Sequence, residues 1–431
     1  HAAADGAEAV SCEVDETPAV LTLDAARADG APQLWDDHPG NVAYAWAKGD
    51  WAAAGEALAA SAHVARLRSH VSRVAAATME PRACVAVPAA DGGLTVWASI
   101  QNAPSMRATL AAILGRPAEE IRVIAPDVGG SFGMKSGPLR EEILVAWAAS
   151  RLGRPVRWAA TRSEALLSDE PGRDMLAEAE LGLDAEGSFT ALRARLTPNV
   201  GAYVSGRSTV AVGNFGGVSG TYRFPVTAGQ VIGVFSNATP SAPYRGAGRP
   251  EATYLTEMAI DQAARELGLD PIELRRRNLV PPEAMPWDTG FIFSYDSGDF
   301  PTIMQKAVEA SDWDGFAARK AESEKRGKLR GRGVGCYLEV TAPVQEEMGG
   351  IRFEENGDVT IITGTLDYGQ GHWTPFAQVL HQKLGVPFER IRLIQGDSAE
   401  LIAGGGTGGS KSIMASGAAI LEASDIVIDK G

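Results

Sequence analysis

Hydrophobic and polar positions follow two periods along this chain, which predicts a mixture of strands and helices. Residues 188–196 alternate at every second position, as in a half-buried strand, whereas the apolar positions of 139–147 recur as on one face of a helix. Apolar runs predict further strands at 9–14, 84–87, 94–99, 121–125, 154–158, 177–181 and 231–235, and helical patterns cover 105–113, 253–267, 300–326 and 420–428. The fold class predicted is α+β.

One stretch of this pattern occurs twice. Each copy contains a strand, a loop with a glutamine, a helix, a Leu-Gly-x-Pro-x-Glu-x-Ile-Arg run and a glycine-rich loop. The first copy covers 94–133 with Gln101 in its loop, and the second covers 358–410 with Gln370. Such a repeat predicts two similar subdomains whose loops face each other across a ligand-binding cleft. The alternative is that both glutamines are turn residues and that the repeat only preserves packing.

The glycine-rich loop of the first copy, 126–135, connects an apolar strand to a helix. Backbone N–H groups at such a junction can bind a phosphate or another anionic oxygen, and glycine lets a bulky ligand approach the backbone. The spacing fits neither the dinucleotide fingerprint nor the P-loop. The alternative is a tight loop that turns the chain and binds nothing.

A second loop rich in glycine, 243–251, carries Arg245 directly before Gly246. A guanidinium beside so small a residue can pack closely against a ligand and pair bidentately with an oxyanion. Taken alone, the loop favours the alternative, in which Arg245 ties the loop to a backbone carbonyl or a carboxylate.

Composition limits the classes of function. With 431 residues, of which 45% are hydrophobic and 22% charged, the chain has core material for two or three domains. The formal net charge of −14 argues against nucleic acid as a partner, and no apolar run approaches the length needed to span a membrane. Cys12, Cys84 and Cys336 are widely spaced, so we expect no iron–sulfur cluster or zinc site within this chain. The same spacing argues against a disulfide framework, so we expect a reducing, cytoplasmic location.

Five short motifs combine into one signature. They are Gly-Gly-Ser-Phe-Gly-Met-Lys at 129–135, Pro-Tyr-Arg-Gly-Ala-Gly-Arg-Pro-Glu at 243–251, Thr-Gly-Gly-Ser at 407–410, Gln101-Asn102, and Gly-Gln-Gly-His at 369–372. Together they resemble the molybdenum-binding large subunit of the xanthine oxidase family, which includes aldehyde oxidoreductases, carbon monoxide dehydrogenase-like proteins and bacterial hydroxylases of N-heterocycles. The resemblance extends over nearly the whole chain, including Met79-Glu80-Pro81-Arg82.

The resemblance implies two related molybdenum-cofactor-binding subdomains, preceded by the tail of an N-terminal α/β hammerhead domain. The expected division is 1–27 as the end of the hammerhead-like domain, 28–50 as a connector, 51–299 as the first molybdopterin-binding domain, 300–332 as a helical linker and 333–431 as an incomplete second molybdopterin-binding domain. Because both ends fall inside predicted elements, we expect an internal fragment or one piece of a split protein.

The resemblance also implies a molybdopterin cofactor with molybdenum, which in bacteria is often the cytosine dinucleotide form. Gln101 is expected to hydrogen-bond an oxygen ligand of the metal, and Arg245 to lie near the metal and the pterin, as the two catalytic residues. The residues expected to bind the cofactor are Gly129, Gly130, Ser131, Phe132 and Gly133 at the metal end, Arg245, and Tyr368, Gly369, Gln370, Gly371, Gly409, Ser410 and Ser412 around the pterin. No protein side chain is expected to ligate the metal directly.

The implied reaction is hydroxylation of an aldehyde or an N-heterocyclic aromatic compound with water as the oxygen source. Electrons are expected to pass to a 2Fe-2S small subunit and an FAD-binding medium subunit, in a dimer of heterotrimers. The family's catalytic glutamate is expected in a glycine-rich motif beyond Gly431. The alternative is a non-catalytic or split cofactor-binding module.

Two departures from the family pattern bear on the substrate. Ser136 stands where some members carry an acidic substrate-binding residue, which disfavours a purine. Residues 246–248 contain no cysteine, unlike well-defined carbon monoxide dehydrogenases, which disfavours carbon monoxide. The substrate pocket is expected around residues 205–218, 247 and 337–347, with Glu339 and Thr341 facing it.

Overall fold

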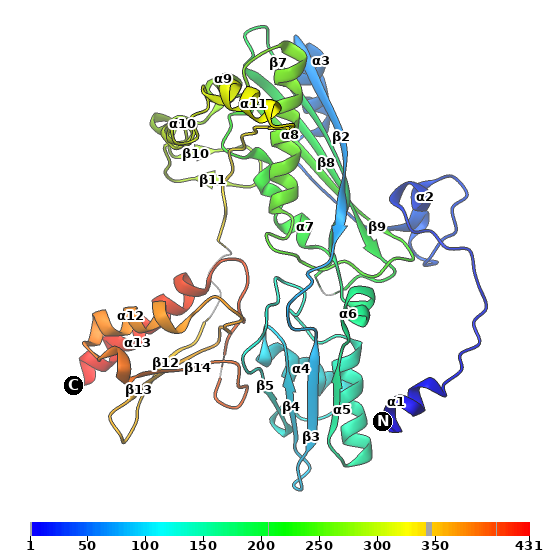
Figure 1. Ribbon diagram of the computed structural model, residues 1–431, viewed down its shortest axis with the longest axis vertical. Helices are drawn as coiled ribbons and strands as arrows, with labels where there is room; N and C mark the ends of the chain where they lie inside the picture. Colours follow the sequence, from blue (N-terminus) through cyan, green and yellow to red (C-terminus); the bar gives the residue numbers. More distant parts are fainter. Residues whose placement is uncertain (1, 206, 342–346, 402) are drawn as a thin grey trace.

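The computed structural model describes residues 2–205, 207–341, 347–401 and 403–431. Within these residues it contains three larger sheets, each packed against helices, and a short hairpin of β10 (Trp287–Asp288) and β11 (Ser294–Tyr295). In Figure 1 a five-stranded sheet forms the upper part of the molecule, and two smaller sheets lie below it. This mixture of helices and sheets confirms the predicted α+β fold.

The upper sheet belongs to the largest core. Its strands follow the order β1 (Val42–Lys48), β9 (Val226–Phe235), β8 (Phe189–Gly201), β7 (Gly172–Leu183) and β2 (His63–Val74). The predicted alternation along β8 is confirmed, because Leu192, Ala194 and Leu196 are fully buried in the core shared with α8 (Arg249–Leu267). Helix α3 (Trp51–Ala60) lies on the opposite face, where Trp51 stacks on Arg193 and Arg195.

The two lower sheets have the same construction. In the first repeat, β3 (Ala83–Pro88) pairs antiparallel with β4 (Leu94–Ala98), and β4 pairs parallel with β5 (Ile121–Ile124) after helix α4 (Ala103–Leu114). In the second repeat the same places are taken by β12 (Gly349–Phe353), β13 (Val359–Thr363), β14 (Ile391–Ile394) and α12 (Trp373–Leu384). A helix follows each glycine-rich loop, α5 (Arg140–Leu152) and α13 (Ser412–Lys430). The internal repeat of the sequence is thus confirmed as a repeat of structure.

Matching residues of the two repeats perform the same local tasks. Gly115 ends α4 with φ 64° and Gly385 ends α12 with φ 70°, a left-handed conformation that glycine adopts without steric cost. In both repeats a single 3-10 turn then leads into the parallel strand, Ala118–Glu120 before β5 and Phe388–Arg390 before β14. The Leu-Gly-x-Pro-x-Glu-x-Ile-Arg run therefore encodes one helix end, one turn and one strand start.

The segment after β14 joins the second repeat to the first. The Ala125 N–H donates to the Gly396 carbonyl at 2.8 Å, and the Val123 N–H donates to Ser398 Oγ at 2.8 Å. Arg122 on β5 pairs with the Asp397 carboxylate. These bonds hold the end of β5, and the glycine-rich loop that follows it, beside the second repeat.

The remaining elements connect these parts. They are β6 (Val156–Ala159), which completes the four-stranded sheet, helices α1 (Ala2–Glu8), α2 (Leu23–Arg27), α6 (Arg162–Ser168), α7 (Val210–Gly213), α9 (Pro271–Asn278), α10 (Phe300–Ala310) and α11 (Phe316–Lys325), and 3-10 turns at Pro39–Asn41, Phe215–Ser219 and Pro282–Ala284. Residues 326–341 cross from α11 to the second repeat without regular structure.

Two expectations near the N-terminus are wrong. The segment 28–50 is more than a connector, because β1 pairs with β9 at the edge of the five-stranded sheet and packs Tyr44 and Trp46 against its core. Residues 9–14 form no strand, since Val10 and Val14 are 69% and 79% exposed and have no pairing partner among the described residues. In both cases the presence or absence of a distant pairing strand determines whether a strand forms, and the local sequence pattern carries no information about such a partner.

Candidate functional site

A cleft of about 1030 Å³ lies where the two repeats meet the loops below the five-stranded sheet. Nine of the residues predicted for the site line it together: Gln101, Phe132, Gly133, Arg245, Tyr368, Gln370, Gly409, Ser410 and Ser412. The prediction that the loops of the two repeats face one another across a cleft is therefore confirmed. The other predicted residues have different places, described below.

Gln101 is held from three sides on the wall formed by the first repeat. Its side-chain N–H groups donate to the Tyr368 hydroxyl at 3.0 Å and to the Thr407 carbonyl at 2.9 Å, and both partners belong to the second repeat. The Ser131 hydroxyl donates to the Gln101 side-chain oxygen, and Ser131 is fully buried. Ser131 thus orients Gln101 and does not face the cleft itself. The alternative of a simple turn residue does not fit Gln101, whose amide bridges the two repeats.

Phe132 projects from the first glycine-rich loop into the cleft, with 42% of its surface exposed. Gly133 beside it has φ 106°, and a Cβ at this position would lie 2.5 Å from the Pro243 carbonyl oxygen. The Phe132 carbonyl accepts a hydrogen bond from the Arg245 backbone N–H at 2.9 Å. The glycine loop and the arginine loop therefore form one continuous wall, and only glycine fits at their closest approach.

Arg245 is available to a ligand. Among the described residues its guanidinium has no hydrogen-bond or ion-pair partner, although the side chain lines the cleft. Arg173 ties this loop instead, by donating to the carbonyls of Tyr244 and Arg245 at 2.7 and 2.8 Å and pairing with Glu251. The structure therefore excludes the alternative in which Arg245 ties the loop together.

The three cleft loops share an unusual backbone feature. Phe132, Ala247 and Ser410 have φ values of 56°, 52° and 60°, a region that residues with side chains rarely occupy. Each such residue costs on the order of 1–3 kcal/mol and persists where the surrounding structure enforces it. Three of the eight non-glycine residues with positive φ in the described part of the chain therefore lie in the cleft loops, and residues of this kind are enriched at ligand-binding and catalytic sites.

Tyr368 and Gln370 stand on the wall formed by the second repeat. The Tyr368 hydroxyl donates to the Thr407 carbonyl at 2.7 Å, and burial raises the pKa of Tyr368 to about 12, so this hydroxyl stays protonated. The Gln370 side-chain oxygen accepts the Tyr368 N–H at 2.7 Å. His372 also lines the cleft and is buried, and burial lowers its pKa, which keeps the imidazole neutral near pH 7.

The backbone N–H groups of residues 369–372 already donate hydrogen bonds to a carboxylate of the protein. The Asp367 carboxylate accepts hydrogen bonds from the N–H groups of Gly369, Gln370, Gly371 and His372 at distances between 2.6 and 3.2 Å. Gly369 and Gly371 line a separate cavity of about 740 Å³ and not the cleft. These two glycines were predicted to bind the pterin, and their backbone N–H groups are not available for that contact here, because Asp367 uses them.

Gly129 and Gly130 also lie outside the cleft lining. The Gly129 N–H donates to the Glu80 carboxylate at 2.7 Å, and the Gly130 N–H donates to the Val128 carbonyl at 2.8 Å. The predicted contact of these two glycines with a cofactor is therefore not supported. The glycine-rich loop does bind an anionic oxygen, but the oxygen belongs to the protein's own Glu80.

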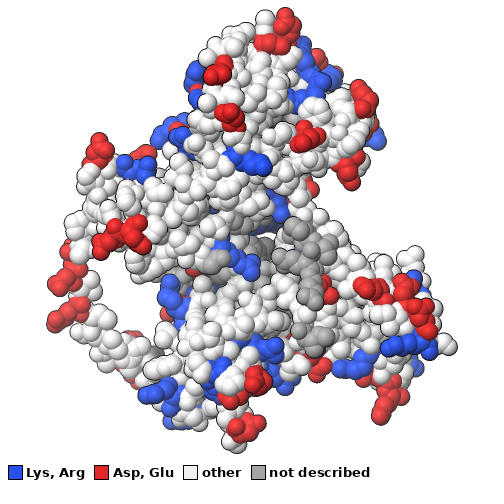
Figure 2. All heavy atoms as spheres, turned by 180° about the vertical axis from the view of Figure 1, so that it is seen from behind, with Lys and Arg blue, Asp and Glu red and all other residues white. Residues whose placement is uncertain are grey.

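The start of α13 opens into the cleft. Residues 407–413 line it continuously, and the helix has no side-chain cap at its first turn. An uncapped helix N-terminus attracts negative charge. Among the residues that the structure describes, the charged side chains that line the cleft are Arg207, Arg245, Arg249, Lys411 and Glu339, four basic and one acidic, in a chain whose net charge is −14. In Figure 2 basic side chains border the central hollow of this face, whereas acidic side chains gather mainly at its outer ends.

Several cleft residues were not predicted individually. Arg207 and Lys411 bring positive charge, Arg249 pairs with Glu339 at 2.7 Å, and Asn102 caps α4 at the cleft edge. Arg249 and Asn102 belong to the recognised motifs and Lys411 follows one directly, so membership of a motif or proximity to it was an available signal. Of the expected substrate-pocket residues, Arg207, Thr209, Asn214, Ala247 and Glu339 line the cleft, Thr341 does not, and 342–346 lie outside the described residues.

Two kinds of feature are absent from the described part of the chain. No group of three or more His, Cys, Asp or Glu side chains is arranged to hold a metal ion there. No helix in that part is long and apolar enough to cross a membrane.

Comparison with known families gives two adjoining matches. Residues 34–279 match the first, and residues 306–431 the second, of two models that are each described as a molybdopterin cofactor-binding domain. The first match includes Gln101, Phe132 and Arg245, and the second includes Tyr368 and Ser412. The cleft lies between residues of the two matched regions.

Individual relatives cover the whole chain. The 6-hydroxypseudooxynicotine dehydrogenase complex subunit gamma of Paenarthrobacter nicotinovorans is 32% identical over 100% of this chain and 54% of its own length. The carbon monoxide dehydrogenase large chain of Hydrogenophaga pseudoflava is 32% identical over 97% of this chain and 56% of its own length. The solved structure of quinoline 2-oxidoreductase from Pseudomonas putida 86 superimposes with a TM-score of 0.90 and 32% identity, covering 99% of this chain and 56% of that one. The chain thus spans about half the length of the relatives it matches.

Proposed function

Because the chain belongs to the molybdopterin cofactor-binding domain family, in the molybdenum-binding large subunits of the xanthine oxidase type, we propose that its cleft holds the molybdenum cofactor of a molybdenum hydroxylase. The observation that carries this proposal is the composition of the cleft. Both family-matched regions contribute to it, and its described lining contains four basic side chains and one acidic side chain, of which Arg249 and Glu339 pair with each other. The Arg245 guanidinium in it has no partner among the described residues. These groups fit a large anionic ligand that is bound without metal-ligating side chains.

Two ends of the cleft take different parts of the ligand in this proposal. The uncapped start of α13, with Ser410 and Ser412, holds its anionic groups, whereas Arg245 lies near the metal and the pterin and pairs with an oxyanion there. Gln101 and Phe132 lie at the reacting end, where the ring excludes water. For Gln101 to donate to the ligand, one of its amide N–H groups exchanges its bond to the Tyr368 hydroxyl or the Thr407 carbonyl for one to the ligand. The cofactor itself supplies the two-electron oxidation of the substrate carbon with water as the oxygen source. Gly133 permits the close approach of the glycine-rich loop to Pro243 that joins the two loops into one wall.

The proposed substrate is an aldehyde or an N-heterocyclic aromatic compound. The relatives support the N-heterocyclic class, since they include a nicotine 6-hydroxylase and a quinoline 2-oxidoreductase. Residues 246–248 contain no cysteine, which is the reason for not proposing carbon monoxide.

Electrons leave the site through partner subunits in this proposal. A 2Fe-2S small subunit and an FAD-binding medium subunit receive them, in a cytoplasmic dimer of heterotrimers. The words "large chain", "large subunit" and "complex subunit gamma" in the names of relatives support a multisubunit assembly. All three cysteines of the chain are free, which agrees with a reducing compartment.

Metal and pterin analysis of the intact protein tests the proposal. The protein is purified from a host able to make the cofactor, and molybdenum and released pterin are measured per chain. We expect about one of each. Turnover of aldehydes and N-heterocycles is then measured with an artificial electron acceptor. Absence of molybdenum would overturn the proposal, and bound cofactor without turnover of either class would favour a non-catalytic or split cofactor-binding module.

A further inference from the structure

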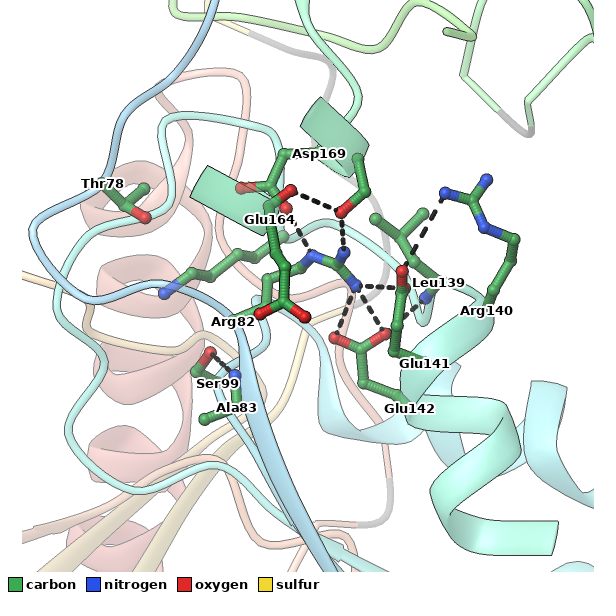
Figure 3. A network of polar contacts seen from close by, with 12 residues as sticks. Thr78, Arg82, Ala83, Ser99, Leu139, Arg140, Glu141, Glu142, Glu164 and Asp169 are labelled. Atoms are coloured by element: carbon green, nitrogen blue, oxygen red, sulfur yellow. Dashed lines mark hydrogen bonds and ion pairs between the residues drawn. The ribbon is translucent and has the colours of Figure 1, made fainter. Parts of the chain in front are cut away.

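The polar segment 78–82 lies behind the glycine-rich loop, on the side away from the cleft. It precedes β3 and contains Glu80 and Arg82, which contact different parts of the chain around residues 129–142. Arg82 is buried and pairs with Glu141 and Glu142 at the start of α5 and with Asp169 after α6 (Figure 3). Glu80 contacts the loop itself.

Glu80 holds both ends of loop 129–135. Its carboxylate accepts hydrogen bonds from the Gly129 N–H at 2.7 Å and from Lys135 Nζ at 3.0 Å. Its backbone N–H donates to the Gly129 carbonyl at 3.2 Å, and its backbone carbonyl accepts from Lys135 Nζ at 2.9 Å. One residue therefore bonds to the first and the last position of the loop through both its side chain and its backbone.

The backbone of the loop packs closely against Glu80. A Cβ at Gly129 would lie 2.4 Å from the Glu80 Cβ, so glycine is required there for contact with Glu80. The Lys135 side chain is fully buried, and Glu80 supplies the carboxylate that compensates its charge. Thr78, itself buried, donates to the Glu80 carbonyl at 2.6 Å and fixes the segment from behind.

The middle of the same loop forms the cleft wall. Phe132 has a positive φ and faces the cleft, and Ser131 donates to the side chain of Gln101. The Gln101 backbone N–H in turn donates to the Lys135 carbonyl at 2.8 Å. A chain of direct bonds therefore runs from Glu80 through Lys135 to Gln101, and Phe132 lies between the two points that Glu80 holds.

We propose that Glu80 is a positioning residue for the cleft, which fixes both ends of loop 129–135 so that Phe132 and Gln101 keep the conformation that receives a ligand. The inference about loop order stands on this chain's contacts alone, and only its consequence for the molybdenum cofactor rests on the proposed function. Glu80 touches no residue of the cleft lining by itself, so its effect on ligand binding passes through the loop.

The test compares Glu80→Ala and Glu80→Gln with a matched control. Asp169→Asn removes a carboxylate from the Arg82 network without contacting loop 129–135. Full-length protein is prepared from a host lacking cofactor synthesis and from one that has it. Backbone hydrogen–deuterium exchange is measured in the cofactor-free protein, and molybdenum and pterin content in the other.

We expect exchange of the Gly129 and Lys135 amides to rise roughly tenfold or more in Glu80→Ala, with the amides of β8 unchanged. Glu80→Gln, which keeps an acceptor for the Gly129 N–H, gives a smaller rise. Asp169→Asn lowers thermal stability but leaves loop exchange as in the parent. Cofactor content falls about fivefold in Glu80→Ala and not in the control, in proportion to the loop effect.

Two results would overturn the inference. One is parental loop exchange in Glu80→Ala, and the other is an equal rise in the Asp169→Asn control, which would assign the effect to general destabilisation. If the parent protein contains no molybdenum, the proposed function fails, but the exchange data still decide whether Glu80 orders the loop.

Discussion

The two repeats share one backbone plan but differ at the start of the helix that follows each glycine-rich loop. At α5, Glu142 accepts the Leu139 N–H at 2.9 Å, and the acidic first turn is paired with the buried Arg82 (Figure 3). At α13, no side chain caps the first turn, and its first residues line the cleft. The same element is closed by internal ion pairs in one copy and open to a ligand in the other.

The difference shows how a duplicated unit acquires two roles. The first-turn sequence Arg140-Glu141-Glu142 supplies the negative charge that a helix N-terminus attracts, whereas Ser412-Ile413-Met414 supplies none. In the first repeat, the glycine loop is fixed by Glu80 and presents a side chain, Phe132, to the cleft. In the second repeat, the loop and the helix start present uncapped backbone and basic charge. We infer that the first copy shapes the reacting end and the second binds the anionic end.

The largest effect is expected where the closed helix start is broken. Arg82→Met leaves Glu142 and Asp169, with 6% and 12% of their side chains exposed, without their cation. Breaking a buried ion pair costs about 3–5 kcal/mol, so the urea midpoint of unfolding should fall sharply. Arg276→Met is the control, because its partner Glu273 is half exposed and such a pair contributes about 0–1 kcal/mol. Equal midpoints for the two variants would contradict this.

The next effect concerns ligand retention without loss of stability. Arg245→Ala removes a guanidinium that has no described partner, so the free energy of unfolding should change by less than about 0.5 kcal/mol. A charge-assisted hydrogen bond is worth about 1.5–3 kcal/mol, so cofactor retention should fall by a factor of about 10–100. Cofactor retention is measured as the molybdenum content of the protein after extensive dialysis. Arg173→Ala, which removes the residue that ties the loop, should instead lower both stability and retention.

Making α13 resemble α5 is expected to separate the two roles. Ser412→Glu places a carboxylate in the open first turn, where it favours the helix by about 0.3–1 kcal/mol and repels an anionic ligand. Thermal stability of the cofactor-free protein should be equal or higher, while cofactor content falls about tenfold. Ser412→Gln has nearly the same shape without the charge and should retain more cofactor. A Ser412→Glu protein that is fully loaded would show that this helix start does not meet the anionic groups.

The smallest effect is expected from Asp367, which uses the backbone N–H groups of residues 369–372. Partial burial alone would raise the pKa of Asp367, but these hydrogen bonds hold it below its usual value. A depressed folded-state pKa gives stability that is complete above the ordinary value of about 3.9 and is lost as the pH falls through the folded-state value. Asp367→Asn should therefore be about 1–2 kcal/mol less stable at pH 7 and approach the parent in strong acid.

Unfolding midpoints measured across the acid range check this prediction. Asp425→Asn, which breaks a more exposed ion pair of the same repeat, is the control and should show no such convergence. A stability difference between parent and Asp367→Asn that stays constant with pH would show that charge at Asp367 does not stabilise the loop.

Much of this architecture was predictable because short sequence motifs determine it. The Leu-Gly-x-Pro-x-Glu-x-Ile-Arg run specifies a helix end, a turn and a strand, and its recurrence predicted two equivalent units. Gln101, Phe132, Arg245 and Tyr368 stand in or beside glycine-rich motifs, and the cleft brings these residues together.

The internal anions were not predictable from local pattern. Glu80 lies 49 residues before Gly129, and a carboxylate in a polar segment has no periodicity that marks its partner. The glycines of the second loop suggested backbone N–H groups free to bind a ligand. Asp367 in the same loop already accepts their hydrogen bonds. The strand at 42–48 was missed for a related reason, since pairing with the distant β9 gives its apolar residues a core.

Anomalous diffraction at the molybdenum edge, from crystals of the cofactor-loaded complex, tests most directly whether the cleft between the two repeats is the cofactor site. We predict a molybdenum peak in the cleft, on the wall formed by Gln101, Phe132 and Arg245. A peak outside this cleft, in crystals of protein shown to contain molybdenum, would contradict the assignment.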